Sequence, residues 1–343
     1  MELQCTVQNY DWGKLGPDST VAKLLSSAHP DLAIDPSKPY AELWMGTHPN
    51  GPSKFGVTVP FLFKILSIRK ALSIQAHPKK DHAEELHKSF PEMYKDPNHK
   101  PELAIALTPF EALCGFRPLV EIQNFLKSKY LLLLCSENLV IAMNVILQEE
   151  IITVYAPTQS SLLYPLLRRL HADFPGDVGC WSPYFLNYML LRPGQAIFLK
   201  PNLPHAYLSG DCVECMACSD NVVRAGLTPK HIDVPTLVDM LDYSSYAQDQ
   251  LLFNPQFEDV NSCIWRPPVS DFAVKNTSNI SQGKRKLGAN HLLEYVIQLM
   301  IFISKGAVFF VQVHTYINLP LKVCIYFVLL WITTRLRLLI QCG

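Results

Sequence analysis

The distribution of hydrophobic and polar residues predicts a mainly β protein. Across residues 6–116, Pro and Gly separate short apolar stretches such as Val59–Leu66. Such punctuation is typical of strands joined by loops. Asp81–Phe90 is the exception, because Ala83 and Leu86 recur at helical spacing among charged residues. We therefore expect a short surface helix there.

The middle of the chain, residues 119–178, has the pattern of a helical insertion. Apolar residues at helical spacing predict one amphipathic helix near residues 121–126 and a second over 160–172. The stretch between them, 131–156, is apolar enough that the pattern does not indicate what it packs against.

Strand and turn patterns resume at Gly179 and continue to about residue 275. The pair Pro193–Gly194 predicts a turn before a strand, and His205 follows that strand. The β structure would thus be assembled from two parts of the chain separated by the helical insertion. Folding that joins such distant parts depends on both of them.

The tail beyond about Asn276 has a different pattern. Residues 306–343 are strongly apolar, and the uninterrupted stretch Val323–Ile332 is bounded by Lys322 and, after two threonines, by Arg335. A single-pass membrane helix needs about 20 apolar residues, so this stretch is too short. We favour a misjoined or truncated isoform tail. A buried pair of strands or helices and a membrane-surface segment are the alternatives.

Composition narrows the class of protein. With 343 residues and 49% hydrophobic content, the chain can bury a large core in one or two domains. Thirty basic and thirty acidic residues cancel, so bulk electrostatics does not favour a nucleic-acid partner. An anionic ligand would have to be bound by local groups.

The ten cysteines are spread over the chain, and Met1–Thr6 lacks the basic and apolar regions of a signal peptide. We therefore expect a reduced, cytoplasmic protein. Cys212, Cys215 and Cys218 have C-x-x-C-x-x-C spacing, which half of a zinc or iron–sulfur site would also have. No second cluster follows at a suitable distance, so we interpret them as packing residues.

Four residues from three separate parts of the sequence have the chemistry of a metal site. Gln75 and His77 are two residues apart, so in a strand their side chains leave the same face. Glu102 and His205 could complete four-fold coordination of zinc. Glutamine is an unusual zinc ligand, and chemistry alone would favour the other three with an open position for water. Taken singly, each is also compatible with an ordinary core or surface role.

The chain resembles type I mannose-6-phosphate isomerases, the zinc-dependent phosphomannose isomerases of the cupin class. The resemblance covers roughly residues 1 to 275. The segments that carry it occur in one order: Asn9–Gly13, Tyr40–Pro49, Pro60–Lys64, Ser73–Pro78, His99–Glu102, Ala112–Pro118 and Pro204–Asp233.

The resemblance implies a mainly β cupin or jelly-roll barrel with a helical insertion and a second jelly roll that is incomplete or absent. We expect four parts: residues 1–118 and 179–275 as the two halves of the catalytic cupin, 119–178 as a shortened helical insertion, and 276–343 as a non-matching tail. It also implies a monomeric enzyme that interconverts mannose 6-phosphate and fructose 6-phosphate, with one Zn²⁺ held by Gln75, His77, Glu102 and His205.

Further roles follow from the resemblance alone. It implies catalytic roles for Arg224, Lys100, Asp220 and His99, and substrate or phosphate binding by Lys64, Ser73, Lys230, Glu42 and Trp12. Arg224 would hold an enediolate oxygen, Lys100 and Asp220 would handle protons, and His99 would assist ring opening. For Lys230 the alternative is an ordinary solvated lysine. Trp12 is equally compatible with core packing, and Glu42 with a structural hydrogen bond. The residue that removes the carbon-bound proton stays open.

Two other classes of protein share part of this pattern. A non-catalytic sugar-phosphate-binding protein, or an inactive truncated isoform, would keep the site without turnover. An iron-dependent cupin oxygenase would favour two or three histidines with a carboxylate and an open face for oxygen.

Overall fold

The structure is a computed structural model of the chain. It describes residues 5–29, 31–53, 60–127, 160–260, 262–278, 295–302, 308–315 and 323–328. The apolar stretch 131–156 and the residues after 328 lie outside this set.

Ten strands form one connected antiparallel sheet around β11 (His205–Ala217). The first half of β11 pairs with β6 and β8, and its second half pairs with β5 and β7. The other nine strands are β1 (Thr6–Gln8), β4 (Glu42–Gly46), β5 (Phe61–Ile68), β6 (Ile74–Ala76), β7 (Glu102–Ala106), β8 (Phe110–Phe116), β9 (Leu186–Leu191), β10 (Ala196–Leu199) and β12 (Val223–Gly226).

β11 can change partners along its length because it is irregular in the middle. Its register with β8 shifts between Tyr207 and Ser209, and Gly210 has a φ of +107°. A Cβ at position 210 would lie 2.5 Å from the backbone oxygen of Pro109. Only glycine fits this bend without strain.

Strand alternation separates the two faces of this sheet. On β5, Phe63 and Ile65 belong to a buried cluster that also contains Trp265, whereas Lys64 between them points into a central cavity. The same alternation on β7 sends Leu103 to that cluster, while Glu102 lies on the cavity side. The polar groups of the cavity therefore come from strands whose other faces are apolar.

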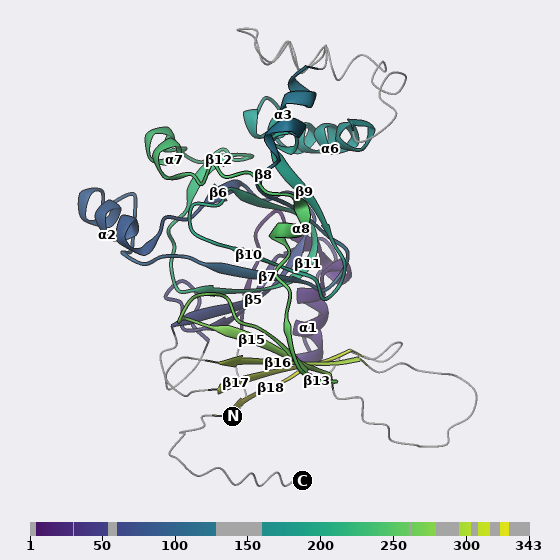
Figure 1. Cartoon of the computed structure of the whole chain (residues 1–343). Coiled ribbons are helices and arrows are strands. Elements are labelled where there is room, and N and C mark those ends of the chain that lie inside the picture. The colour runs from purple at the N-terminus through teal and green to yellow at the C-terminus, as the bar shows by residue number, and fades with distance from the viewer. Residues whose placement is uncertain are drawn as a thin grey trace.

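A second antiparallel sheet of six strands lies at one end of the molecule (Figure 1). Trp265 and Val274 of this sheet pack in one cluster with residues of β4, β5, β7 and β11. Its strands are β13 (Gln256–Asp259), β14 (Ser262–Trp265), β15 (Ala273–Ser278), β16 (Tyr295–Phe302), β17 (Val308–Thr315) and β18 (Val323–Val328).

The described parts of the tail form strands. The hypothesis of a misjoined or truncated isoform tail stays a prediction. Among the described residues, no helix is long and apolar enough to cross a membrane. The fold is mainly β, as predicted. The division of the chain into four parts stays a prediction.

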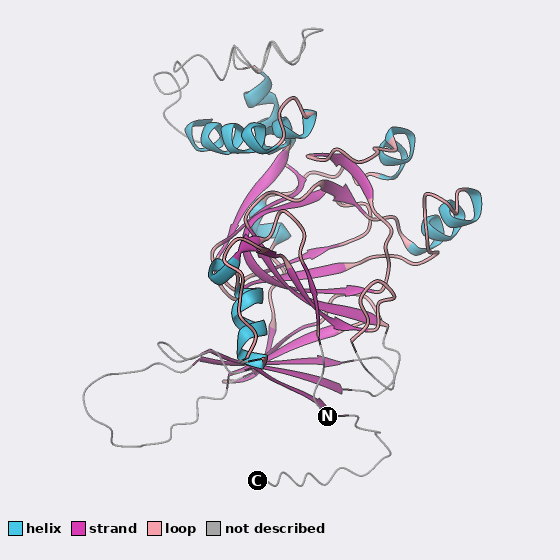
Figure 2. Ribbon diagram, turned by 180° about the vertical axis from the view of Figure 1, so that it is seen from behind, coloured by secondary structure: helices cyan, strands magenta, loops and turns pink. Residues whose placement is uncertain are grey.

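The helices lie around the sheets, and Figure 2 shows them from behind. The predicted helices are confirmed as α2 (Lys80–Ser89), α3 (Leu119–Leu126) and α6 (Ser160–Asp173), and α3 and α6 lie at the end opposite the second sheet (Figure 1). The remaining elements are α1 (Thr20–Ala28), α7 (Val234–Met240), α8 (Gln248–Leu251), the 3₁₀ helices η1 (Gly16–Asp18) and η3 (Val178–Tyr184), and the short strands β2 (Lys14–Leu15) and β3 (Pro39–Tyr40).

The cysteines at positions 212, 215 and 218 do not converge. Cys212 and Cys215 are buried in two different hydrophobic clusters, and Cys218 packs against a third. They are packing residues, as the sequence indicated.

Candidate metal centre

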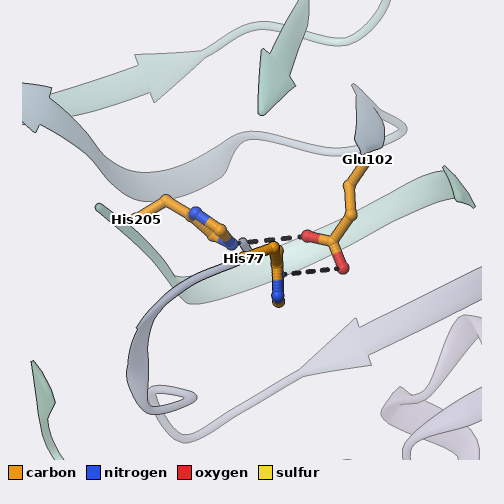
Figure 3. Close-up of side chains that lie close together, drawn as sticks. All are labelled: His77, Glu102 and His205. Atoms are coloured by element: carbon orange, nitrogen blue, oxygen red, sulfur yellow. Dashed lines mark ion pairs between the residues drawn. The ribbon is translucent and has the colours of Figure 1, made fainter. Parts of the chain in front are cut away.

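His77, Glu102 and His205 point toward one another in the interior, next to the central cavity (Figure 3). The Nε2 atom of His77 lies 3.4 Å from Oε1 of Glu102, and Nε2 of His205 lies 3.3 Å from Oε2. Their potential ligand atoms all lie within 4.8 Å of one another. Among the residues that the structure describes, this is the one group of His, Cys, Asp and Glu side chains close enough to share a metal ion.

Backbone carbonyls orient both imidazoles. Nδ1–H of His77 donates to the carbonyl of Asn221 at 2.7 Å, and Nδ1–H of His205 donates to the carbonyl of Leu203 at 2.8 Å. These hydrogen bonds leave the Nε2 lone pairs directed at the carboxylate, where they are buried and accept no hydrogen bond. Two lone pairs and an anionic oxygen facing one point form a donor set that suits zinc.

The protonation states also suit a metal. Burial lowers the pKa of His77 to about 4, so its imidazole is neutral at pH 7. Burial opposes ionisation of Glu102. The interactions with Lys100 and His77 outweigh this effect of burial, and Nζ of Lys100 lies 3.2 Å from Oε1. The pKa of Glu102 is therefore held well below its usual value.

Gln75 reaches this centre through strand pairing. It lies on β6 directly opposite His205 of β11 on one side and Arg224 of β12 on the other. Its side chain lines the cavity beside the three converging residues. β6 ends at Ala76, so His77 is one residue beyond the strand that the spacing predicted.

The cavity next to the metal centre has a volume of about 230 Å³. Its lining is mostly polar and comes from many elements. It includes Tyr10, Glu42, Trp44, His48, Asn50, Lys64, Gln75, Lys100, Glu102, Tyr207, Glu214, Ser219, Asp220 and Arg224. A space of this size and polarity accommodates a small hydrophilic molecule.

Lys64 is bound within the cavity wall by two carboxylates. Its Nζ lies 2.8 Å from Glu214 and 3.8 Å from Glu42. Burial disfavours the ammonium, but Glu214 and Glu42 outweigh this and raise the pKa of Lys64. Burial, together with the nearby charge of Glu102, raises the pKa of Glu214. Trp44 Nε1 donates a further hydrogen bond to Glu42.

Asp220 and Arg224 face the cavity with different surroundings. The carboxylate of Asp220 contacts His48 at 3.3 Å and Asn50 at 3.0 Å, and the hydrogen bond from His48 lowers its pKa. Arg224 is half-buried, and it makes no ion pair with any residue in the described part of the chain. Its guanidinium is therefore available to an anion.

Four of the predicted catalytic and substrate-binding residues do not line the cavity. His99 pairs with Asp271 at 3.2 Å, and Trp12 stacks on Tyr10 with ring centroids 5.7 Å apart. Ser73 immediately precedes β6. Lys230 is exposed, four residues after the end of β12.

Sequence reasoning missed several residues that line the cavity. Glu214 is the clearest, because it is a lone carboxylate within the apolar strand Cys212–Ala217, and a buried unpaired charge is costly. That signal was available. His48 and Asn50 belong to a segment that carries the family resemblance, but nothing in their spacing indicates contact with Asp220, 170 residues later than Asn50.

Comparison with known proteins gives the family. Mannose-6-phosphate isomerase from Homo sapiens is 44% identical over 342 residues, which covers 80% of this chain and 81% of that protein. The chain belongs to the type I phosphomannose isomerase family. The model of the type I phosphomannose isomerase catalytic domain matches residues 1–58 and 53–119. The mannose-6-phosphate isomerase of Aspergillus fumigatus is 40% identical, covering 83% of both chains.

Solved phosphomannose isomerase structures share the fold. A zinc-bound mannose 6-phosphate isomerase superposes with a TM-score of 0.63 and 32% identity, covering 81% of this chain and 83% of that one. The apo form from Salmonella typhimurium gives a TM-score of 0.64 and 30% identity over 87% and 85% of the two chains. In this member of the family, the three converging side chains could hold the same kind of ion.

Proposed function

We propose that this chain is a zinc-dependent aldose–ketose isomerase that interconverts mannose 6-phosphate and fructose 6-phosphate. The observation that carries the proposal is the buried cluster of His77, Glu102 and His205, whose unsatisfied donor atoms lie beside a polar cavity. Relatives named mannose-6-phosphate isomerase, at 40–45% identity, support this choice of substrate.

The reaction moves a proton between neighbouring carbons through an enediolate, so the site must stabilise a negative oxygen and hold an acid and a base nearby. Gln75, His77, Glu102 and His205 would hold one Zn²⁺. Since Glu102 is the one anionic ligand of the four, the zinc site would keep a net charge of about +1, which suits a Lewis acid.

The groups of this chain divide the remaining work. The unpaired guanidinium of Arg224 is suited to bind an enediolate oxygen through two N–H donors. Lys100 and Asp220 both line the cavity and interact electrostatically, which supports a proton-handling role for the pair. A role for His99 in ring opening stays a prediction, and His99 contacts Asp271 and does not line the cavity.

We propose that Ser73 and Lys230 bind the phosphate. Ile74 pairs with Gly226, so the start of β6 lies beside the end of β12. Ser73 immediately precedes that start, and Lys230 follows that end by four residues. The charge of Lys64 is already balanced by Glu42 and Glu214, so its predicted role in phosphate binding is less well supported. Glu42 lines the cavity, which supports a substrate-pocket role, and its contacts with Trp44 and Lys64 also fit the structural role that the sequence left open.

The test uses the purified full-length chain, stripped with a chelator and reloaded with zinc. Conversion of mannose 6-phosphate, followed by a coupled assay for fructose 6-phosphate, should appear with zinc and disappear without it. Binding of mannose 6-phosphate without turnover would instead indicate a non-catalytic sugar-phosphate-binding protein. Stoichiometric iron in the protein as purified would favour the oxygenase alternative. The proposal includes a monomeric, cytoplasmic enzyme, which sedimentation and cell fractionation test.

A further inference from the structure

A short segment next to the metal centre holds a loop that supplies two of its groups. Residues 96–98, which we call the 96–98 segment, contact residues 218–221, the 218–221 loop. Asp96 Oδ2 accepts the backbone N–H of Asp220 at 2.8 Å, and Oδ1 accepts the hydroxyl of Ser219 at 2.9 Å. Asn98 Nδ2 donates to the carbonyl of Cys218 at 2.9 Å. The segment therefore fixes the loop along its whole length.

The side chain of Asn221, in the 218–221 loop, adds hydrogen bonds to the 96–98 segment. Its Nδ2 donates to the backbone carbonyl of Asp96 at 2.6 Å and to that of Asn98 at 2.9 Å. Ser219 and Asn221 are buried, with 3% and 2% exposure, whereas Asp96 and Asn98 are half-buried. A network of several hydrogen bonds of this kind restricts a loop to one conformation.

The 218–221 loop carries one group that faces the cavity and another that contacts a candidate metal ligand. The Asp220 carboxylate enters the cavity, and the Asn221 carbonyl accepts the Nδ1–H of His77 at 2.7 Å. A shift of the loop would move both at once. The segment also leads directly into Lys100 and Glu102, so its own position is tied to the metal centre through the chain.

We propose that Asp96 is a positioning residue for the reaction. Its carboxylate does not line the cavity, and it acts by holding Asp220 at the substrate and the Asn221 carbonyl on His77. The kinetic part of this inference rests on the proposed isomerase function. The metal-binding part does not.

The test is Asp96→Asn in the full-length, zinc-loaded chain. Asp96 Oδ2 accepts the backbone N–H of Asp220, and Oδ1 also accepts the backbone N–H of Asn98 at 2.9 Å. An amide NH₂ cannot accept a hydrogen bond, so one of these two backbone contacts is lost whichever way the amide is turned. We expect kcat to fall about 10- to 100-fold with KM changed less than about 2-fold, because misplacement by about 1 Å can cost that much in rate. Zinc loss to a chelator should be about 10-fold faster, as for other changes behind a metal ligand.

Two comparisons separate positioning from general destabilisation. Asp81→Asn removes an exposed carboxylate that accepts a local backbone N–H on α2, and it should change neither kcat nor zinc release. The double variant with Asp220→Asn should turn over no more than about 3-fold slower than Asp220→Asn alone, because residues acting as a unit are not additive. Additive losses, or a wild-type rate of zinc release in Asp96→Asn, would overturn the inference.

Failure of the proposed function would be recognisable on its own. If the zinc-loaded wild type lacked isomerase activity, zinc release and hydrogen exchange of the Asp220 amide in wild type and Asp96→Asn would still decide whether Asp96 holds the loop. Faster exchange in the variant supports the inference, and equal exchange contradicts it. If Asp96→Asn does not fold, Asn98→Ala, which removes the contact to Cys218 and an exposed one to Lys80, should give a smaller change in the same direction.

Discussion

Individual residues of the metal centre are already in the state that binds a cation. The neutral imidazole of His77 and the ionised carboxylate of Glu102 both result from their surroundings in the folded chain. A preformed donor set of this kind lowers the cost of binding, but it also makes the protein sensitive to acid.

The free energy of unfolding of the metal-free protein should fall on acidification. The folded pKa of His77, about 4, is below its usual 6.5, so between these values the unfolded state binds the extra proton. One proton corresponds to a loss of about 1.4 kcal/mol per pH unit. Glu102, whose pKa is lowered, adds a loss in the same direction at still lower pH. Urea unfolding from pH 7 to 4 measures this, and His77→Gln should remove most of the slope above pH 4.5.

Arg224→Ala should separate catalysis from metal binding. We expect zinc content near that of wild type and turnover lower by about 10²–10³-fold, the usual cost of losing one group that stabilises a developing oxyanion. Atomic absorption and the coupled assay measure the two quantities. His205→Ala is the matched comparison, since it should lose the metal instead. Unchanged turnover in Arg224→Ala would remove the guanidinium from the mechanism.

The sequence indicated residue types better than their contacts. His77, Glu102 and His205 have the chemistry of zinc ligands, and the structure brings them together. Glu214 was not predicted because its partner Lys64 is 150 residues away, and strand register rather than local spacing makes them neighbours. The neighbours of Asp96 were hidden for the same reason, since they lie more than 120 residues later.

At the level of elements, β11 depends on a glycine where it passes from one pair of neighbours to the other. Gly210→Ala should destabilise the protein by about 3 kcal/mol or more, because the new Cβ meets backbone atoms as well as an unfavourable φ. Gly194→Ala is the control, since its φ is also positive but nothing lies within 4 Å of the added atom. That variant should lose only about 1 kcal/mol. Equal losses in urea unfolding would show that crowding at position 210 is unimportant.

Amphipathic helices were the elements best predicted from the sequence. The helix expected over 160–172 is α6 (Ser160–Asp173), because leucines such as Leu163 and Leu167 recur on one face and are buried there. The tail was ambiguous, since a continuous apolar stretch has neither the period of a helix nor that of a half-buried strand. β18 (Val323–Val328) occupies the first part of that stretch, paired with β17.

For the molecule as a whole, the second sheet is joined through shared packing to the sheet that carries the candidate metal centre. Trp265 and Val274 lie in the same cluster as residues of β5 and β11, and Asp271 contacts His99 near the cavity. All four proposed zinc ligands lie outside this sheet. Metal binding and the integrity of the tail should therefore be separable.

A chain that ends at Ser278 should keep its zinc and lose solubility. It retains the packed residues of β14 and β15, but β15 loses its partner β16 along the register Ala273–Phe302 to Ser278–Ile297. An exposed strand edge promotes association. Sedimentation velocity should show oligomers, and urea unfolding a lower midpoint. A chain ending at Val328 keeps every described strand and should behave like the full chain. A monomeric, equally stable short form would contradict this.

The position of Gln75 between His205 and Arg224 limits how the gene can change. Adding or deleting one codon within β6 would rotate Gln75 away from the cavity and bring an apolar neighbour in its place. Such a change keeps the reading frame, but it would remove Gln75 from the zinc ligands and also displace Arg224, which pairs with it. Codons for the exposed end of α2 carry no such restriction, so natural length variation should accumulate there and not in the three residues of this strand.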